Sequence, residues 1–364
     1  MIDVERALLG AILLEPAGQR HLLDLVTCND FYRPWHGQVL AAMRRLAAHG
    51  VLPGPIEVHA ELKNDPDLPQ SVSHDAVLLA DLMDAAPRPS HAPAYAGLVI
   101  SGAIRRQVAL AGGRICQAAQ EPGDDLLDDS DLDNARHQVT LARGELDACR
   151  ARWEALPEPV RRQLQAPRGH TDAGRRAPRP SGQETRPACH AADAAGLAVL
   201  RDLTADSSRI ADVAGWLRSG HFARRQHGEL YALLLDLQAA GMPADPVITC
   251  AEARRRGIRV EPRDLADGTG ALAAAHGRQV WRRAALARAA RAGQEIQAAA
   301  ANPGLPTAKL MADAGERLLR LGPEPAGPDH PISHGDARVL ALPSRRADPG
   351  QLQARRDHGR EAAG

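Results

Sequence analysis

Hydrophobic residues recur every three or four positions along much of the chain, which is the spacing of amphipathic α-helices. The first such segment ends at Pro16. A later one begins at Pro34, a residue favoured in a first helical turn, and ends at Gly50, a residue favoured just after a helix. The helices predicted in the first part of the chain span about 2–14, 17–27, 34–49, 55–64, 73–85, 94–120 and 126–155. The last two predict a helical hairpin.

The helical pattern stops between residues 157 and 190, where Pro, Gly, Arg and polar residues follow one another without a period. Such a segment buries too little apolar surface to fold, so it predicts a disordered linker. The helical pattern then returns and ends again near residue 321. The predicted organisation is a helical domain at 1–155, a Pro/Arg/Gly-rich linker at 156–192, a second helical domain at 193–321 and a disordered tail at 322–364.

The two helical domains repeat one another. At an offset of 191 residues the matching positions are Phe31 with Phe222, His36 with His227, and Gly50 with Gly241. The second copy then lacks about ten residues, and at an offset of 181 two predicted helices, 269–300 and 306–320, repeat the hairpin. This pattern indicates an internal duplication of an all-α unit, a head plus a hairpin.

Each copy uses the repeated residues as a structural corner. We expect the two phenylalanines to fill the core in front of a helix. The two histidines then lie at the start of that helix, where an imidazole can bond to the backbone, and the two glycines end it.

Composition narrows the possible functions. The 45 Lys and Arg balance the 45 Asp and Glu, which gives no support to a dedicated polyanion-binding protein. Five widely spaced cysteines form neither a zinc-binding nor a disulfide pattern. The start of the chain does not resemble a signal peptide, and no apolar run reaches the length of a membrane span. We therefore expect a cytoplasmic protein that has no membrane segment.

The sequence shows none of the common catalytic motifs. A P-loop needs the pattern GxxxxGK[ST], but the only two lysines, Lys63 and Lys309, do not follow a glycine. The patterns G-x-S-x-G, HExxH and GxGxxG are also missing, and no histidine has partner ligands at metal-binding spacing. We therefore expect no catalytic residues, no cofactor and no metal.

Two stretches carry a family resemblance. ERALLGAILL, followed by DFYRPWHGQVLAAMRRLAAHG, resembles the N-terminal domain of DnaB-type replicative DNA helicases. LLADLMDAAPRPSHAPAYAGLVISGAIRRQV resembles the segment of that domain that leads through a tyrosine, here Tyr95, into the hairpin. The resemblance extends over about 2–150 and, more weakly, over 194–320. It implies a helical head and hairpin of the helicase collar, which engages primase and loading factors, without the RecA-like motor.

The resemblance implies a non-catalytic interaction module of DNA replication, with the replicative helicase, primase or a helicase loader as partner. Hairpins of this family pair with one another, so we expect self-association through the hairpins and, in this chain, pairing of its own two hairpins. The apolar residues expected to line that contact are Ile104, Val108, Ile115, Leu286 and Ile296.

Other functions remain open at this point. A DNA-binding accessory protein would use the Arg-rich linker and the helix 281–291, and its possible phosphate contacts are Arg282, Arg283, Arg288 and Arg291. The acidic stretch 124–133 fits a helix N-terminus or a docking site for an Arg-rich partner. The chain could also be a protein labelled a replicative helicase by similarity that lacks the ATPase, or a relic of a duplicated gene.

Overall fold

The computed structural model describes residues 1–65, 76–120, 129–165 and 186–322, and within these ranges every regular element is a helix. The longer helices are α1 (Ile2–Leu14), α3 (Pro34–Ala48), α4 (Pro55–Lys63), α6 (Ala76–Asp84), α7 (Ala92–Ala118), α8 (Ser130–Glu154), α9 (Glu158–Gln165), α10 (Arg186–Ala205), α12 (Arg225–Ala239), α13 (Pro246–Arg255), α14 (Ala273–Ala301) and α15 (Thr307–Arg320). Shorter turns of helix are α2 (Leu22–Leu25), α11 (Ile210–Ala214), η1 (Cys28–Asp30), η2 (Pro89–His91), η3 (Ser207–Arg209), η4 (Ser219–His221) and η5 (Pro262–Asp264). The predicted all-α fold class is confirmed.

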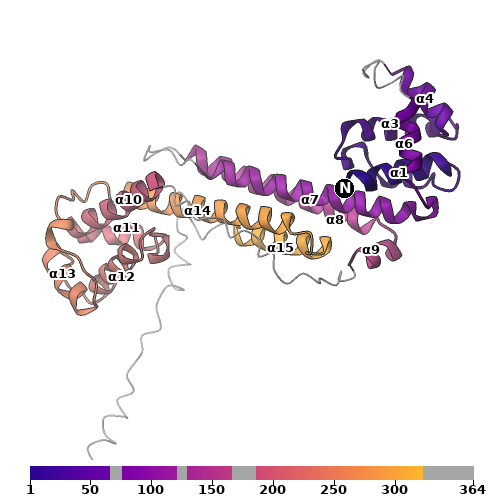
Figure 1. Cartoon of the computed structure of the whole chain (residues 1–364). Helices are drawn as coiled ribbons and strands as arrows, with labels where there is room; N and C mark the ends of the chain where they lie inside the picture. Colours follow the sequence, from indigo (N-terminus) through magenta and orange to yellow (C-terminus); the bar gives the residue numbers. More distant parts are fainter. Residues whose placement is uncertain (66–75, 121–128, 166–185, 323–364) are drawn as a thin grey trace, which may run out of the picture.

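Two compact heads lie at opposite ends of a long helical bundle (Figure 1). The first head packs α3, α4 and α6 around α1, whose Leu8, Leu9 and Ile12 are fully buried. The second head is built from α10 to α13, and its core includes Val199, Leu200 and the fully buried ring of Tyr231. Each copy of the sequence duplication therefore forms a helical head of its own, and the buried cores of the two heads continue into the bundle between them.

The bundle between the heads consists of two hairpins, α7 with α8 and α14 with α15, which we call the hairpin bundle. Helix α7 packs along α14, and α8 packs along α15 (Figure 1). The two central helices run antiparallel, since Arg105 of α7 contacts Ala300 of α14 while Cys116 contacts Ala290. The two hairpins therefore pair with each other inside one chain.

Equivalent glycines of the two copies meet where α7 crosses α14. A Cβ atom on Gly112 would lie 2.8 Å from the carbonyl oxygen of Gly293, and a Cβ atom on Gly293 would lie 2.6 Å from that of Gly112. One turn further on, the Cys116 thiol lies 3.9 Å from the Gln297 amide oxygen, and these residues also correspond at the 181-residue offset. Residues that meet their own counterparts mark a local two-fold axis, as in a symmetric dimer.

Two predicted boundaries differ from the structure. The range 156–192, expected as a disordered linker, contains the helix α9 and the start of α10 at Arg186. Helix α9 packs on α7 through Val160, which is 7% exposed and lies over Gly97, so this segment continues the first domain. Residues 166–185 and the tail 323–364 lie outside the described residues, and the disorder predicted for them stays a prediction. The segment 17–27 is helical only at Leu22–Leu25.

We expect Gly293→Leu to destabilise the protein by about 2–3 kcal/mol, because a side chain there forces α7 and α14 apart. The matched control is Gly144→Leu on α8, where nothing lies within 4 Å of the added Cβ. This control should raise stability by about 0.5–1 kcal/mol through helix propensity alone. Urea unfolding followed by circular dichroism measures both, and equal effects of the two changes would contradict the close-crossing argument.

Candidate interaction site

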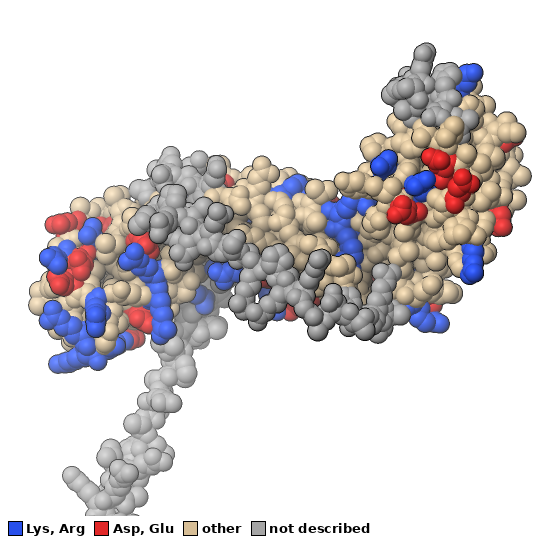
Figure 2. All heavy atoms as spheres, in the orientation of Figure 1, with Lys and Arg blue, Asp and Glu red and all other residues tan. Residues whose placement is uncertain are grey.

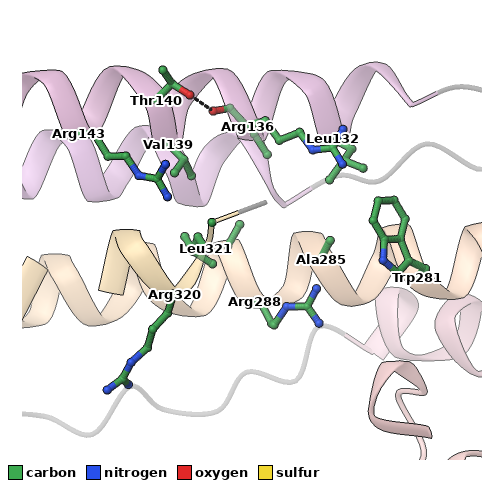
Figure 3. A pocket seen from close by; sticks show the side chains of 13 residues that line it. Leu132, Arg136, Val139, Thr140, Arg143, Trp281, Ala285, Arg288, Arg320 and Leu321 are labelled. Carbon is green, nitrogen blue, oxygen red and sulfur yellow. Dashed lines mark hydrogen bonds between the residues drawn. The ribbon is translucent and has the colours of Figure 1, made fainter. Parts of the chain in front are cut away.

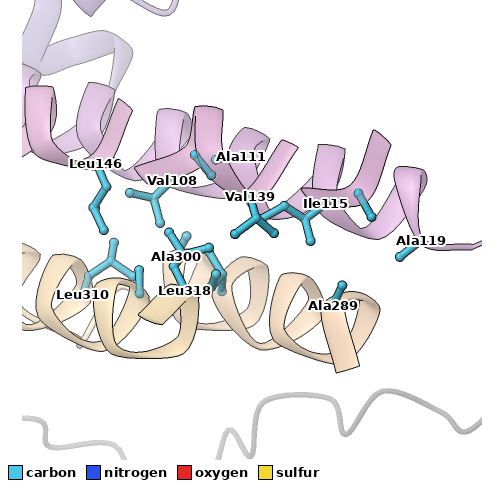
Figure 4. Close-up of a cluster of buried hydrophobic side chains, with 14 of the residues drawn as sticks. Val108, Ala111, Ile115, Ala119, Val139, Leu146, Ala289, Ala300, Leu310 and Leu318 are labelled. Atoms are coloured by element: carbon cyan, nitrogen blue, oxygen red, sulfur yellow. The ribbon is translucent and has the colours of Figure 1, made fainter. Parts of the chain in front are cut away.

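The hairpin bundle has a continuous apolar core. The five residues expected at the hairpin contact are all buried: Ile104 is 0% exposed, Val108 4%, Ile115 0%, Leu286 1% and Ile296 2%. Val108 and Ile115 on one hairpin and Ile296 on the other line a single apolar space that Leu146 and Leu318 close. Figure 4 shows Val108, Ile115 and Leu146 facing Ala300, Leu310 and Leu318 across the two hairpins. This core joins the heads into one elongated body.

Polar contacts join the two hairpins at one end of the bundle. The Arg105 guanidinium on α7 donates hydrogen bonds to the carbonyl oxygens of Ala300, Asn302 and Leu305, where the second hairpin turns. The Ser101 and Thr307 hydroxyls lie 2.7 Å apart. Charge-assisted bonds from one Arg to three carbonyls satisfy groups at the C-terminus of α14 that have no partner within the helix.

At the other end of the bundle Arg282 occupies the position equivalent to Ser101. It is 1% exposed, and its guanidinium lies 3.8 Å from Asp129 and 3.9 Å from Asp131 at the start of α8. The described part of the acidic stretch 124–133 therefore faces arginines of the same chain, including Arg278 at 4.0 Å from Asp129. Residues 124–128 lie outside the described residues.

Burial also corrects the expected phosphate contacts. Arg282 and Arg283 are 1% and 9% exposed, so they face the interior of the bundle instead of solvent. Arg288 is partly buried, and Arg291 is exposed. The predicted phosphate contacts at Arg282 and Arg283 are wrong because α14 packs against α7, α8, α10 and α15.

The corner of the first head contains a buried contact between His36 and Glu5 that was not predicted from the sequence. His36 Nδ1 lies 2.8 Å from Glu5 Oε2, and the two side chains are 3% and 0% exposed. Glu5 also accepts a hydrogen bond from the backbone N–H of Tyr32, at 2.8 Å. The imidazole therefore bonds to a carboxylate and not, as expected, to the backbone. A signal was present, since Glu5 lies three, four and seven residues before Leu8, Leu9 and Ile12, on the apolar face of α1.

The other corner residues lie where the repeat predicts. Phe31 and Phe222 are both buried at 7% exposure. Gly50 and Gly241 have backbone φ angles of 76° and 68°, a conformation that favours glycine at the end of a helix. The glycine after each histidine has a reason as well, because a Cβ atom on Gly37 would lie 2.7 Å from the carbonyl oxygen of Cys28.

The second corner has lost the carboxylate. Gly196 stands at the position equivalent to Glu5, and His227 Nδ1 is buried without a hydrogen-bond partner among the described residues. Burial, with the nearby charge of Arg224, lowers the pKa of His227, while Asp193 acts in the opposite direction. In the second head another carboxylate contacts a histidine. Asp202 lies 2.7 Å from His276, and His276 occupies the position equivalent to Tyr95. Asp202 also accepts hydrogen bonds from the backbone N–H groups of Thr269 and Gly270.

The contact between head and hairpin also differs between the copies. In the first copy Asp30, fully buried, lies 2.5 Å from Arg152 of α8 and accepts the Thr27 N–H at 2.7 Å. The equivalent residue in the second copy is His221, whose Nδ1 accepts the Arg218 N–H at 3.1 Å. Burial and then the charges of Arg288 and Arg218 lower the pKa of His221 to about 4. The imidazole is therefore neutral at pH 7.

Exposed apolar side chains repeat on the two heads. In the first head Val51 is 40% and Ile56 79% exposed, and in the second head the equivalent Met242 is 48% and Val247 67% exposed. These four residues, which we call the head-tip residues, lie at the start of α4 and α13 or just before it. Large apolar side chains are thus left in solvent at matching positions of the two heads.

Charge on the visible face of the molecule is mixed. Figure 2 shows acidic and basic side chains together on both heads, and some basic side chains on the visible part of the bundle. Among the described residues there is no group of three or more His, Cys, Asp or Glu that could hold a metal ion. Within the same residues, no helix is both long and apolar enough to cross a membrane.

Comparison with known proteins identifies the repeated unit. The model of the DnaB-like helicase N terminal domain matches residues 1–101 and again residues 193–272. The chain is 31% identical over 135 residues to the replicative DNA helicase DnaB of Geobacillus stearothermophilus, covering 36% of this chain and 29% of that protein. It is 32% identical over 140 residues to the replicative DNA helicase DnaB of Leifsonia xyli, covering 38% and 30%. The chain thus spans less than a third of the length of these relatives.

We expect Glu5→Ala to destabilise the protein by about 3–5 kcal/mol, because it leaves His36 and the Tyr32 N–H buried without their acceptor. Glu61→Ala, which removes the partly exposed Arg45–Glu61 pair, is the matched control and should cost about 1 kcal/mol or less. Chemical denaturation at pH 7.5 gives both values, and a Glu5 effect no larger than the Glu61 effect would refute the role of the buried pair.

Stability should fall between pH 6.5 and pH 4 because of His221. Its pKa is about 4 when folded and about 6.5 when unfolded, so in this window the unfolded chain binds a proton that the folded chain does not. The stabilisation is complete above pH 6.5 and is lost as the pH falls toward 4. Of the loss measured between pH 7.5 and 4.5, about 2 kcal/mol should vanish in His221→Asn. An unchanged pH profile in that variant would contradict this assignment.

Proposed function

Because two segments of this chain belong to the DnaB-like helicase N-terminal domain family, we propose that the protein is a non-catalytic interaction module of DNA replication. It acts in the cytoplasm and binds a DnaB-type replicative helicase, with primase and a helicase loader as the other candidate partners. Self-association through the hairpins is satisfied within the chain. The free protein is therefore expected to be a monomer of 38.8 kDa.

One observation carries this proposal. Pairing of the two hairpins buries their apolar faces, while the head-tip residues of both copies stay exposed at opposite ends of the bundle. The chain therefore presents the same kind of surface twice, at a separation set by the bundle. Two linked binding surfaces raise the apparent affinity for a partner that repeats its own sites, and a ring of identical subunits is such a partner.

The alternatives have less support. The detected similarity is confined to the N-terminal domain of the relatives, so it gives no reason to assign a motor activity to these residues. A DNA-binding role through α14 has less support because Arg282 and Arg283 are buried in the bundle, and residues 166–185 of the Arg-rich linker lie outside the described residues.

Size-exclusion chromatography with light scattering tests the proposal. The full chain is run alone and then mixed with the replicative helicase, the primase and the loader of its own host, one at a time. A complex of defined mass with any of these partners supports the proposal. Separate elution from all three at micromolar concentrations would overturn it.

A variant of the head-tip residues tests whether these residues contact the partner. Ile56→Glu combined with Val247→Glu places a charge in each head-tip surface without touching the core, and we expect it to weaken the complex by about tenfold or more. Leu319→Glu on α15 is the control, because Leu319 is 72% exposed but lies on the bundle, away from the heads. Equal weakening by the two variants would rule out the head tips as the contact.

A further inference from the structure

Pairing of the hairpins creates a cavity of about 400 Å³ at the surface of the bundle, between α8, α14 and the end of α15. Four arginines line it: Arg136 and Arg143 from α8, Arg288 from α14 and Arg320 from α15. None of the described residues that line the cavity is acidic. The volume lies within the range of about 300–1,000 Å³ that is usual for small-molecule sites.

Arg143 is the central cation of this cavity. Figure 3 shows its side chain pointing from α8 into the space between α8 and α14. One of its terminal nitrogens donates to the carbonyl oxygen of Leu318, at 2.6 Å, which fixes the guanidinium plane. Its Nε is buried and has no hydrogen-bond partner among the described residues. The guanidinium is thus held at the cavity, where an anion can accept a charge-assisted hydrogen bond from it.

Arg136 and Arg320 keep most of their charge available to the cavity. Arg136 lies 5.7 Å from the centre of the Trp281 ring, and its carboxylate contact is Asp133 at 3.3 Å, an exposed pair. Arg320 lies at the rim beside an equally exposed Glu316. Exposed ion pairs contribute little free energy, so these arginines can turn to a ligand at small cost.

The remaining wall is apolar. Leu132, Val139, Trp281 and Ala285 line one side, and the Thr140 hydroxyl is the main uncharged polar group. The cavity thus combines a polycationic part with a flat apolar part. A ligand that matches both has two or more negative charges on one end and a planar, weakly polar group on the other.

We propose that this cavity binds a free nucleotide, with the di- or triphosphate held by Arg143 and Arg136 and the base against the apolar wall. Arginine forks match phosphate oxygens in pairs, and their partial burial strengthens that attraction. The site exists only when the two hairpins are paired, because its lining comes from both. The inference does not depend on the replication partner proposed above.

Isothermal titration calorimetry on the full chain, with ADP and separately with inorganic pyrophosphate, tests the proposal. We expect ADP to bind, and Arg143→Gln to weaken binding by about tenfold or more. Arg150→Gln is the matched control: Arg150 also lies on α8 and also donates to an α15 carbonyl, that of Met311, but it lies outside the cavity. This control should change the affinity less than about twofold.

A second variant keeps every charge. Ala285→Leu narrows the cavity from its apolar wall and should weaken ADP more than pyrophosphate, since only ADP carries a base. Thermal unfolding followed by circular dichroism establishes that each variant is folded, and Arg136→Gln replaces Arg143→Gln if the latter is not.

Three results would overturn the proposal. The first is no heat of binding with millimolar ADP or pyrophosphate. The second is an equal loss with Arg150→Gln, which would indicate a general surface charge effect. The third is binding of a ten-residue oligothymidylate but not of ADP, which would indicate a nucleic-acid surface instead of a nucleotide cavity.

Discussion

The close crossing of α7 and α14 at Gly112 and Gly293 is the contact on which the rest of the molecule depends. Each glycine leaves room for the carbonyl oxygen of the other, so the two backbones approach more closely than larger residues would allow. That approach brings Ile115 and Ile296 into one core and places Arg105 at the turn of the opposite hairpin. The separation of the two heads and the arginine-lined cavity both follow from it.

The two copies use different polar residues to stabilise the corner of the head and its contact with the hairpin. In the first copy two buried carboxylates, Glu5 and Asp30, hold the corner and the hairpin. In the second copy a glycine and a histidine replace them, and a partly buried contact between Asp202 and His276 is formed instead. A buried carboxylate that loses its partner destabilises the fold. Loss of one residue of such a pair therefore favours loss of the other residue or a rearrangement around it. The interacting polar residues of each head have therefore changed together, and both heads remain folded.

A tandem arrangement also changes what a family domain can do. When hairpins of separate chains pair, assembly depends on protein concentration. Here both hairpins belong to one chain, so their pairing is intramolecular and persists at any dilution. The bundle then sets the separation of the two heads, and the arginine-lined cavity beside Arg143 forms at its surface only because both hairpins contribute to it.

The sequence by itself determined the helices, their duplication and the ends of several elements. Predicted helix 2–14 matches α1, and the glycines after α3 and α12 adopt the expected positive φ, because periodicity and backbone preference are local properties. Only the tertiary structure decided which polar residues are buried. Arg282 and Glu5 are charged residues of a kind usually found at the surface. Arg282 is nevertheless enclosed between the two hairpins, and Glu5 is buried against His36. Their roles depend on neighbours more than 25 residues away in the chain, and no local pattern records such neighbours.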